Sequence, residues 1–213
     1  MRAQLLCAIE AGCIMLALIL AGGEGTRLKL GEKALVPVAG KAMAARVVDA
    51  FLDARIDPVL VTSHKTPFTK NWCRANGVDF IDTAGAGYLE DLREAVVMSG
   101  EDGPLFTAAC DIPCLTGAII RKVLEAYAAS GKEACSTWVP VTLCEHYGTK
   151  PRYIETIDSI PAAPCALNIF FGSRVEDEQS ELTLLLHEPG LAFNVNTREE
   201  LEKLERLLES GAF

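Results

Sequence analysis

The sequence predicts a single α/β domain built on a mainly parallel, twisted β-sheet. Short apolar runs alternate with amphipathic helical stretches along nearly the whole chain, which is the pattern of strand–helix–strand units. The 213 residues, half of them hydrophobic, are enough to bury one sizeable core. No internal repeat, low-complexity tract or linker divides them. In such sheets ligands bind beyond the carboxyl ends of the strands, so we look for function there.

The first half of the chain supplies three strands and three helices. Strands are predicted at 17–21, 57–63 and 78–83, and helices at 40–56, 66–77 and 87–100. The first helix is expected to bury one face formed by Ala42, Ala45, Val48 and Leu52. The second begins at the N-cap Thr66 with Pro67 in its first turn and ends at Gly77.

The second half continues the alternation less regularly. We expect a strand running into a loop at 104–113, a helix at 116–131, β-rich segments at 133–143 and 163–171, a strand at 191–196 and a helix at 197–210. Thr197 and Glu200 have the spacing of a capping box at the start of this last helix. The segment 145–164 has no clear period and is predicted to be an insertion or flap.

The composition limits the kinds of binding partner that are expected and indicates the cellular compartment. The net charge is −9, from 29 acidic and 20 basic residues, which disfavours broad contact with nucleic acid or an anionic membrane. A local basic cluster still allows a small anionic ligand. The eight cysteines form no CxxC pair and no zinc-like spacing, which favours reduced core cysteines and a cytoplasmic location.

Residues 1–14 are interpreted as an N-terminal extension that precedes a domain covering 15–213. A signal peptide is an alternative interpretation of the apolar beginning of the chain. Glu10 interrupts that stretch, and the remaining apolar run is shorter than the ~20 residues of a membrane span. We therefore expect no membrane-spanning segment.

A glycine-rich loop follows the first strand and carries two cations. Gly22, Gly23 and Gly25 leave backbone N–H groups free to approach an anion, while Arg27 and Lys33 add positive charge. The dinucleotide-binding pattern GxGxxG fails because its last position is Leu28, and the Walker pattern has no match. A tight turn with a surface arginine is the structural alternative. The loop is predicted to hold a triphosphate.

The stretch "LAGGEGTRL" with a downstream lysine resembles the signature of nucleotidyltransferases that join an NTP to a phosphorylated acceptor and release pyrophosphate. This resemblance implies a three-layer, Rossmann-like nucleotidyltransferase fold. It also implies catalytic roles for Arg27 and Lys33. Nucleotide-binding roles are implied for Ala21, Gly22, Gly23, Gly25 and Thr26. The family usually has Lys-Pro where this chain has Lys33-Ala34.

Two further motifs extend the resemblance to a metal site. "AACDIP" places Asp111 at the end of a strand, and "FNVNTREEL" places Asn196 before the last helix. In the family these positions are Mg²⁺ ligands, and Mg²⁺ takes only one or two oxygen ligands from protein when phosphates and water supply the rest. The alternatives are a helix-capping carboxylate at Asp111 and a turn residue at Asn196.

The stretch "FIDTAGAGYLEDLREAV" resembles a narrower family, the archaeal-type GTP:adenosylcobinamide-phosphate guanylyltransferases of cobamide synthesis. The likeness covers about residues 15–208 and is weak between 144 and 163. It implies GTP and adenosylcobinamide phosphate as substrates and a homodimer. By this analogy Asp82, Thr83, Gly85 and Gly87 bind the base. Asn168 is a candidate for the floor of the acceptor site, although its segment also fits a core strand.

Other functions stay open at this point. A molybdenum cofactor guanylyltransferase or a sugar-phosphate nucleotidyltransferase would share the loop and the metal site. A non-catalytic GTP-binding subunit or sensor is a different class, and it need not retain Arg27, Lys33 and Asp111 together. The three histidines form no recognisable catalytic constellation.

Overall fold

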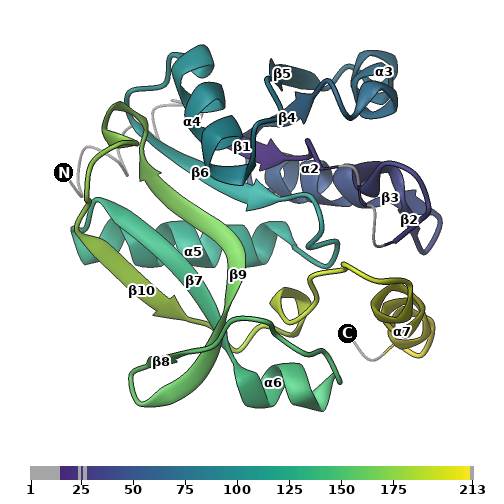
Figure 1. Cartoon of the computed structure of the whole chain (residues 1–213). Coiled ribbons are helices and arrows are strands. Elements are labelled where there is room, and N and C mark those ends of the chain that lie inside the picture. Colours follow the sequence, from purple (N-terminus) through teal and green to yellow (C-terminus); the bar gives the residue numbers. More distant parts are fainter. Residues whose placement is uncertain (1–14, 24, 26–27, 212–213) are drawn as a thin grey trace.

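The computed structural model describes residues 15–23, 25 and 28–211, and Figure 1 shows one sheet flanked by helices. Within the described residues the main sheet has eight strands. Seven follow the order β10-β7-β9-β6-β1-β4-β5, and β8 pairs with β9 outside this path. The predicted extension at 1–14 lies outside the described residues.

The strands of the main sheet are β1 (Leu16–Leu20), β4 (Asp57–Ser63), β5 (Asp79–Thr83), β6 (Pro104–Ala109), β7 (Ala134–Pro140), β8 (Glu155–Ile157), β9 (Ile160–Phe171) and β10 (Glu181–Leu185). A separate two-stranded ribbon is formed by β2 (Pro37–Val38) and β3 (Lys41–Ala42). The α-helices are α2 (Met43–Asp53), α3 (Pro67–Asn76), α4 (Tyr88–Ser99), α5 (Gly117–Ser130), α6 (Val141–His146) and α7 (Arg198–Glu209). Short 3₁₀ turns are η1 (Lys33–Leu35), η2 (Gly172–Arg174) and η3 (Pro189–Leu191).

The sheet is mainly parallel, as predicted. β1 pairs in parallel with β4 and β6, β4 with β5, and β7 with β10. β9 runs antiparallel to both of its neighbours, β6 and β7. The carboxyl ends of β1, β4, β5 and β6 therefore meet at one edge, where a doubly wound sheet binds its ligands.

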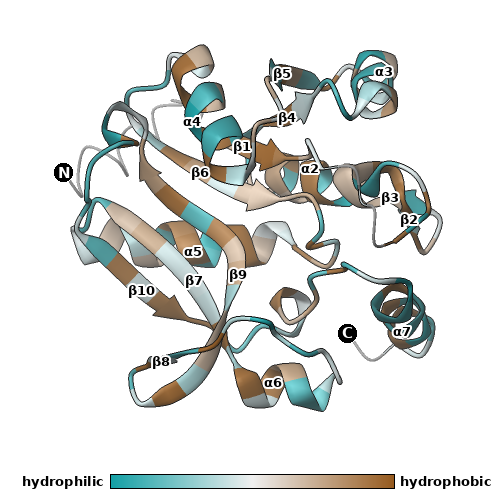
Figure 2. Cartoon of the chain, in the orientation of Figure 1, coloured by the Kyte–Doolittle hydropathy of each residue, from teal (hydrophilic) through white to brown (hydrophobic). Residues whose placement is uncertain are grey.

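Strand β1 shows how the layers form. Ala17 and Ile19 face a core shared with α2 and α5, whereas Leu18 packs in a second core with Leu92 and Val96 of α4. Strand alternation sends successive side chains to opposite faces, so a central strand must be apolar on both. Figure 2 shows β1 as hydrophobic, in contrast to the mostly hydrophilic α7. The three-layer architecture is confirmed.

The first predicted helix is correct in type but wrong in its buried face. α2 begins at Met43 because the two preceding residues pair with β2 as strand β3. Its buried stripe includes Met43, Val47, Val48 and Phe51, whereas Leu52 is 56% exposed. Among the residues predicted for that face, Val48 is fully confirmed as buried.

The second half differs from the prediction in three places. The segment 191–196 is not a strand: it passes the end of β6, where the N–H of Val195 donates to the carbonyl of Asp111 at 2.9 Å. The strand β10, at one edge of the sheet, was not predicted. The segment 133–143 changes to helix after Pro140, and the irregular segment 145–164 contains β8 and the start of β9.

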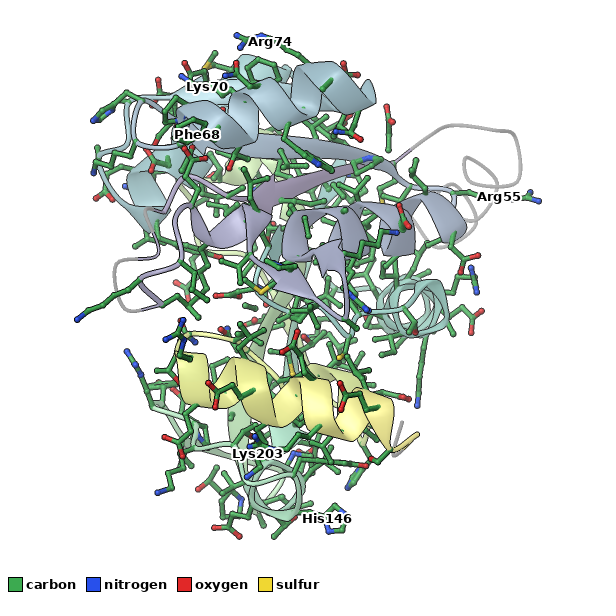
Figure 3. All side chains as sticks on the ribbon, turned by 90° about the vertical axis from the view of Figure 1, so that its right-hand side faces the viewer. Arg55, Phe68, Lys70, Arg74, His146 and Lys203 are labelled. Atoms are coloured by element: carbon green, nitrogen blue, oxygen red, sulfur yellow. The ribbon has the colours of Figure 1, made fainter. Side chains whose placement is uncertain are left out.

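The last helix lies beside α6 at one end of the molecule. Figure 3 shows Lys203 of α7 on the side facing α6, and its Nζ donates to the carbonyl of Gly148 at 3.0 Å. Helices α6 and α7 are thereby tied together just after α6 ends. Across the described ranges, none of the helices is both long and apolar enough to span a bilayer.

Candidate active site

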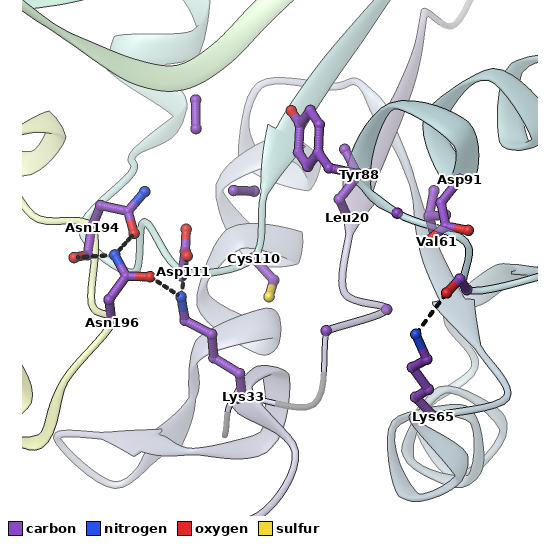
Figure 4. Close-up of a pocket in the computed structure, with 17 residues that line it drawn as sticks. Leu20, Lys33, Val61, Lys65, Tyr88, Asp91, Cys110, Asp111, Asn194 and Asn196 are labelled. Carbon is purple, nitrogen blue, oxygen red and sulfur yellow. Dashed lines mark hydrogen bonds and ion pairs between the residues drawn. The ribbon is translucent and has the colours of Figure 1, made fainter. Parts of the chain in front are cut away.

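A cleft of about 580 Å³ opens where the carboxyl ends of the parallel strands meet (Figure 4). Most of its walls come from the turns that follow β1, β4, β5 and β6, and β9 and the segment before α7 complete them. The residues lining it are Leu20, Gly22, Gly23, Gly25, Lys33, Val61, Lys65, Gly85, Gly87, Tyr88, Asp91, Ala109, Cys110, Asp111, Ala166, Asn194 and Asn196. The cleft is therefore where the fold class predicts a ligand.

Lys33, Asp111 and Asn196 converge in this cleft. The Lys33 ammonium forms an ion pair with Asp111 Oδ2 and donates to Asn196 Oδ1 at 2.8 Å (Figure 4). These contacts join residues 78 and 163 positions apart in the sequence. One cation thus lies between the carboxylate and the amide oxygen that the resemblance paired as metal ligands.

Asp111 is held by backbone contacts on both sides. The N–H of Cys110 donates to the carbonyl of Leu20 at 3.1 Å, which prolongs the β6–β1 pairing, and the carbonyl of Asp111 accepts from Val195. The side chain does not cap the next helix, because Thr116 is the N-cap of α5. Asp111 Oδ1 is buried and has no hydrogen-bond partner among the described residues. A buried carboxylate oxygen without a partner is costly unless a cation binds it.

Asn196 is fixed from the helix that follows. Thr197 and Glu200 form the predicted capping box at the start of α7. Glu200 Oε2 also accepts the N–H of Asn196 at 2.7 Å, and the amide Nδ2 of Asn196 donates to Asn194 Oδ1 at 2.6 Å. These bonds direct Asn196 Oδ1 toward the cleft. Asn196 is therefore more than a turn residue before the helix.

The glycine loop lines the cleft beside Lys33. Gly22, Gly23 and Gly25 line it as predicted. Gly25 has φ +64°, and an added Cβ there would lie 2.8 Å from the Cβ of Lys33, so only glycine fits this close approach. Ala21 is buried and donates its N–H to the carbonyl of Val61 at 2.8 Å. This bond attaches the start of the glycine loop to β4. Thr26 and Arg27 lie outside the described residues.

The predicted base-binding residues separate into two groups. Gly85 and Gly87 line the cleft. Asp82 instead forms an ion pair with Lys70 at 3.0 Å, and Thr83 donates its hydroxyl proton to the carbonyl of Thr62 at 3.0 Å. Neither Asp82 nor Thr83 is among the residues that line the cleft.

The acceptor candidate Asn168 is also absent from the cleft lining. It lies within β9, opposite Thr107 of β6 and Ser136 of β7. The cleft reaches β9 only at Ala166. Asn168 therefore occupies the core-strand position that was the alternative for this segment.

Among the cleft residues that were not predicted, four have a charged, amide or phenol side chain: Lys65, Tyr88, Asp91 and Asn194. Lys65 Nζ donates to the carbonyl of Gly85 at 2.7 Å, and Asp91 Oδ1 accepts the N–H of Ala86 at 3.0 Å. Both bonds hold the turn after β5 in place, and Figure 4 shows the one made by Lys65. Lys65 could have been found in the sequence, because it comes two residues after the end of the predicted strand 57–63.

Tyr88 begins α4 and lines the cleft, although 49% of the residue is exposed. Burial raises the pKa of its phenol above the ordinary value of 10.0, and the negative charge of Asp111 raises it further. The phenol is therefore neutral at physiological pH. A neutral ring at the edge of a cleft suits packing against a flat ligand.

The donor set decides what kind of metal site is possible here. Within the described residues there is no group of three or more His, Cys, Asp or Glu side chains that could hold a metal ion. Asp111 and Asn196 offer one carboxylate and one amide oxygen, which suits a hard cation that takes most of its ligands from phosphates and water. The unpartnered Oδ1 of Asp111 fits such a cation.

Comparison with known proteins identifies the family of this chain. The model of the MobA-like NTP transferase domain matches residues 17–211. The adenosylcobinamide-phosphate guanylyltransferase of Methanocaldococcus jannaschii is 31% identical, over 91% of this chain and 97% of that protein. The molybdenum cofactor guanylyltransferase of Desulfosudis oleivorans is 27% identical, over 91% of this chain and 96% of that protein.

A solved structure shows the same fold. HddC from Yersinia pseudotuberculosis, in a complex with GMP-PN, superposes with a TM-score of 0.70 at 16% identity. The match covers 92% of this chain and 100% of that one. With the cleft at the carboxyl edge of its sheet and the domain match over nearly its whole length, the chain belongs to the MobA-like NTP transferase family.

Proposed function

We propose that this protein transfers GMP from GTP to adenosylcobinamide phosphate and so forms adenosylcobinamide-GDP and pyrophosphate. The observation that carries the proposal is the convergence of Lys33, Asp111 and Asn196 beside the glycine loop. The choice of acceptor is supported by the guanylyltransferase from M. jannaschii, which is similar along 97% of its length. The stretch "FIDTAGAGYLEDLREAV" supports it as well.

The reaction needs positioning and charge more than proton transfer. An oxygen of the acceptor phosphate attacks the α-phosphorus of GTP, the bond from this phosphorus to the bridging oxygen of the β-phosphate breaks, and pyrophosphate leaves. A phosphomonoester has a second pKa near 6, so the nucleophile is already ionised at neutral pH and requires no general base. Lys33, and Arg27 by the family resemblance, would offset the charge of the triphosphate and of the leaving pyrophosphate.

Mg²⁺ is the cation that we propose for this reaction. Asp111 and Asn196 would hold it, since their oxygens already converge on the ammonium of Lys33 and Asp111 Oδ1 has no other partner in the described chain. When bound, the ion would supply Lewis-acid stabilisation of the phosphate oxygens. The homodimer, the cytoplasmic location and the absence of nucleic-acid contact remain predictions.

Two other functions compete with this one. Transfer to the molybdenum cofactor is favoured by the D. oleivorans relative, which is similar over the same share of the chain. A GTP sensor without turnover is disfavoured by the partly buried Lys33–Asp111 ion pair, because binding alone does not require this charge pair in the cleft.

Pyrophosphate release from purified protein tests the proposal. The reactions contain Mg²⁺ with GTP and adenosylcobinamide phosphate, and parallel reactions replace GTP by ATP or the acceptor by mannose 1-phosphate. We expect release only with GTP and the corrinoid. Measurable GTP binding without release would contradict the corrinoid assignment and favour the molybdenum cofactor or the sensor. Release with mannose 1-phosphate would favour a sugar-phosphate enzyme.

A further inference from the structure

A second hollow of about 200 Å³ opens beside the cleft and shares Asn194 and Asn196 with it. Its outer wall is formed by residues 149–153, from the segment between α6 and β8 that was predicted to be an insertion or flap. Because both hollows include Asn196, a ligand in the smaller one would lie next to the proposed phosphate and metal site. The smaller hollow is therefore placed where a second substrate must approach the first.

Two cations of the outer wall are free. Lys150 and Arg152 both line the hollow and both are exposed. In the part of the chain that the structure describes, neither side chain has an ion-pair or hydrogen-bond partner, unlike Lys33 and Arg174. The chain carries a net charge of −9, so two unpaired cations in one concavity are not explained by the average composition. Their charge fits an anion.

The wall that carries these cations is anchored to the active site. Thr149 is buried, its N–H donates to the carbonyl of Cys144 at 2.8 Å, and its hydroxyl donates to the carbonyl of Ala192 at 2.9 Å. Ala192 precedes Asn194 by two residues. Lys203 holds the neighbouring Gly148 from α7. The backbone of Lys150 is therefore fixed relative to Asn194 and Asn196.

The outer wall also has an aromatic part. Tyr153 lines the hollow, is 53% exposed and lies with its ring centroid 6.3 Å from that of Trp138. The ring N–H of Trp138 donates to Ser136 Oγ at 2.9 Å, and this bond fixes the indole that contacts Tyr153. An exposed aromatic ring on a fixed support gives packing area to a large, partly apolar ligand at low entropic cost.

Glu200 is the negative group in this hollow. Its Oε2 accepts the backbone N–H groups of Asn196 and Thr197, at 2.7 and 2.9 Å. Two N–H donors offset part of its charge, so the carboxylate serves mainly as a cap for α7. Lys150 and Arg152 remain as the charges available to an anionic ligand.

We propose that Lys150 and Arg152 bind the phosphate of the acceptor substrate, while Tyr153 packs against its apolar body. The acceptor class is a phosphomonoester carried by a large, partly apolar ring system. The inference rests on the proposed function, since it assigns the acceptor subsite of the same reaction. Asn196, shared by both hollows, would mark the point where acceptor phosphate and nucleotide meet.

The test compares wild type with Lys150→Ala, Arg152→Ala and the double variant. Steady-state pyrophosphate release gives KM for adenosylcobinamide phosphate, and a separate titration gives the affinity for GTP. We expect KM to rise about threefold in each single variant and at least about tenfold in the double variant, because each cation contributes a partly screened attraction. GTP affinity and kcat should stay within about twofold of wild type. Raising the salt concentration should increase KM more in wild type than in the double variant.

Two control variants separate charge from folding. Lys150→Arg keeps the positive charge and should retain a KM within about twofold of wild type. Lys132→Ala removes an exposed lysine from the turn between α5 and β7 and should leave KM unchanged. An increase in KM with Lys132→Ala equal to that of Lys150→Ala would mean a general effect of net charge and would overturn the proposal.

Equilibrium dialysis distinguishes this inference from the proposed function. Binding of adenosylcobinamide phosphate and of unphosphorylated adenosylcobinamide is measured by corrin absorbance, without GTP. We expect wild type to prefer the phosphorylated form and the double variant to lose this preference. A preference that persists in the double variant overturns the subsite while the proposed function stands. Wild-type protein that binds and turns over neither corrinoid overturns both.

Discussion

Lys33 is the residue at which three separate parts of the chain meet. Its side chain is 14% exposed, and it contacts the carboxylate of Asp111 at the end of β6 and the amide of Asn196 before α7. A partly buried ion pair of this kind stabilises little by itself, but removal of one partner leaves a charge without compensation. Lys33 therefore links the integrity of the cleft to the charge that it offers a triphosphate.

Replacement of Lys33 by alanine is expected to reduce turnover at least about tenfold while the fold persists. The variant leaves Asp111 unpaired, so the free energy of unfolding should fall by about 1–3 kcal/mol. Pyrophosphate release and urea unfolding measure the two effects. The same loss of turnover is predicted for Arg27→Ala, whose position lies outside the described residues.

Lys41→Ala is the matched control for Lys33→Ala. It also removes a lysine–aspartate ion pair, with Asp49, but both side chains there are about half exposed. Such a pair contributes at most about 1 kcal/mol, and turnover should not change. If Lys33→Ala and Lys41→Ala gave the same turnover, the catalytic role of Lys33 would be refuted.

Some of the predicted site residues line the cleft and others do not, and the difference has one cause. Lys33, Asp111 and Asn196 were found because each belongs to a short motif. Asp82 was assigned to the base site by family analogy, and in the structure its carboxylate forms an ion pair with Lys70 of α3. Asp91 lies in the cleft instead, one helical turn into α4. The direction of a side chain depends on the residues that pack beside it in the folded protein. A short sequence motif contains no information about those distant residues.

At the level of elements, the glycine loop and η1 have to fit against each other. Gly25→Ala should impair the site because the new Cβ would lie 2.8 Å from the Cβ of Lys33 and 3.0 Å from its backbone nitrogen. The left-handed backbone at φ +64° adds a strain of about 1 kcal/mol. We expect reduced stability together with reduced GTP affinity and turnover.

Gly77→Ala provides the comparison for Gly25→Ala. Gly77 ends α3 at the same φ, +64°, but an added Cβ would have open space around it. The Gly77→Ala variant should therefore lose stability but keep the GTP affinity and turnover of wild type. Equal GTP affinities in the two variants would mean that the contact with Lys33 does not matter.

The capping box of α7 connects an element to the site. Thr197→Ala removes the side chain that accepts the N–H of Glu200, and such caps contribute about 1 kcal/mol. Because Glu200 also holds the N–H of Asn196, loosening the cap should lower turnover as well as stability. Thr197→Ser keeps the hydroxyl and should behave like wild type in thermal unfolding and pyrophosphate release. A stability loss with unchanged turnover would show that the cap does not position Asn196.

At the scale of the whole molecule, the core is rich in buried thiols. Burial raises the pKa of Cys110, Cys135 and Cys165 from 9.0 to about 12, and Asp111 adds to the effect at Cys110. The cysteines at 73, 110, 114, 135, 144 and 165 are free in the structure, in agreement with the expectation of reduced core cysteines. A thiol with a raised pKa is a poor nucleophile at neutral pH, which favours a packing role.

These shifts predict a loss of stability in alkaline solution. Above about pH 9 the thiols ionise in the unfolded chain but stay protonated in the folded one, so ionisation lowers the free energy of the unfolded state and the folded state loses stability relative to it. The stability contribution is complete below pH 9 and is lost as the pH rises toward about 12. Urea unfolding at pH 8 and pH 10 should show the decrease, and Cys165→Ala should make it smaller. Equal stabilities at both pH values would contradict the burial of these thiols.

The sequence alone determined the features that depend on near neighbours. Periodicity predicted most helices and strands, glycines at positions 77, 100 and 131 end helices in the left-handed conformation, and Thr197 and Glu200 form the predicted box. Motifs of a few residues pointed to the phosphate loop. Each of these features follows from backbone preferences and from contacts within one or two helical turns. Both depend only on residues that are close together in the sequence.

The tertiary structure decided the features that depend on distant partners. It inserted β9 as an antiparallel strand between β6 and β7, and it placed the unpredicted β10 at one edge of the sheet, while 191–196 forms no strand. It also joined Lys33 to residues 78 and 163 positions away, and it placed Lys150 and Arg152 beside Asn196. Such contacts are selected by how whole layers pack and bury their apolar faces, and no local pattern encodes that choice.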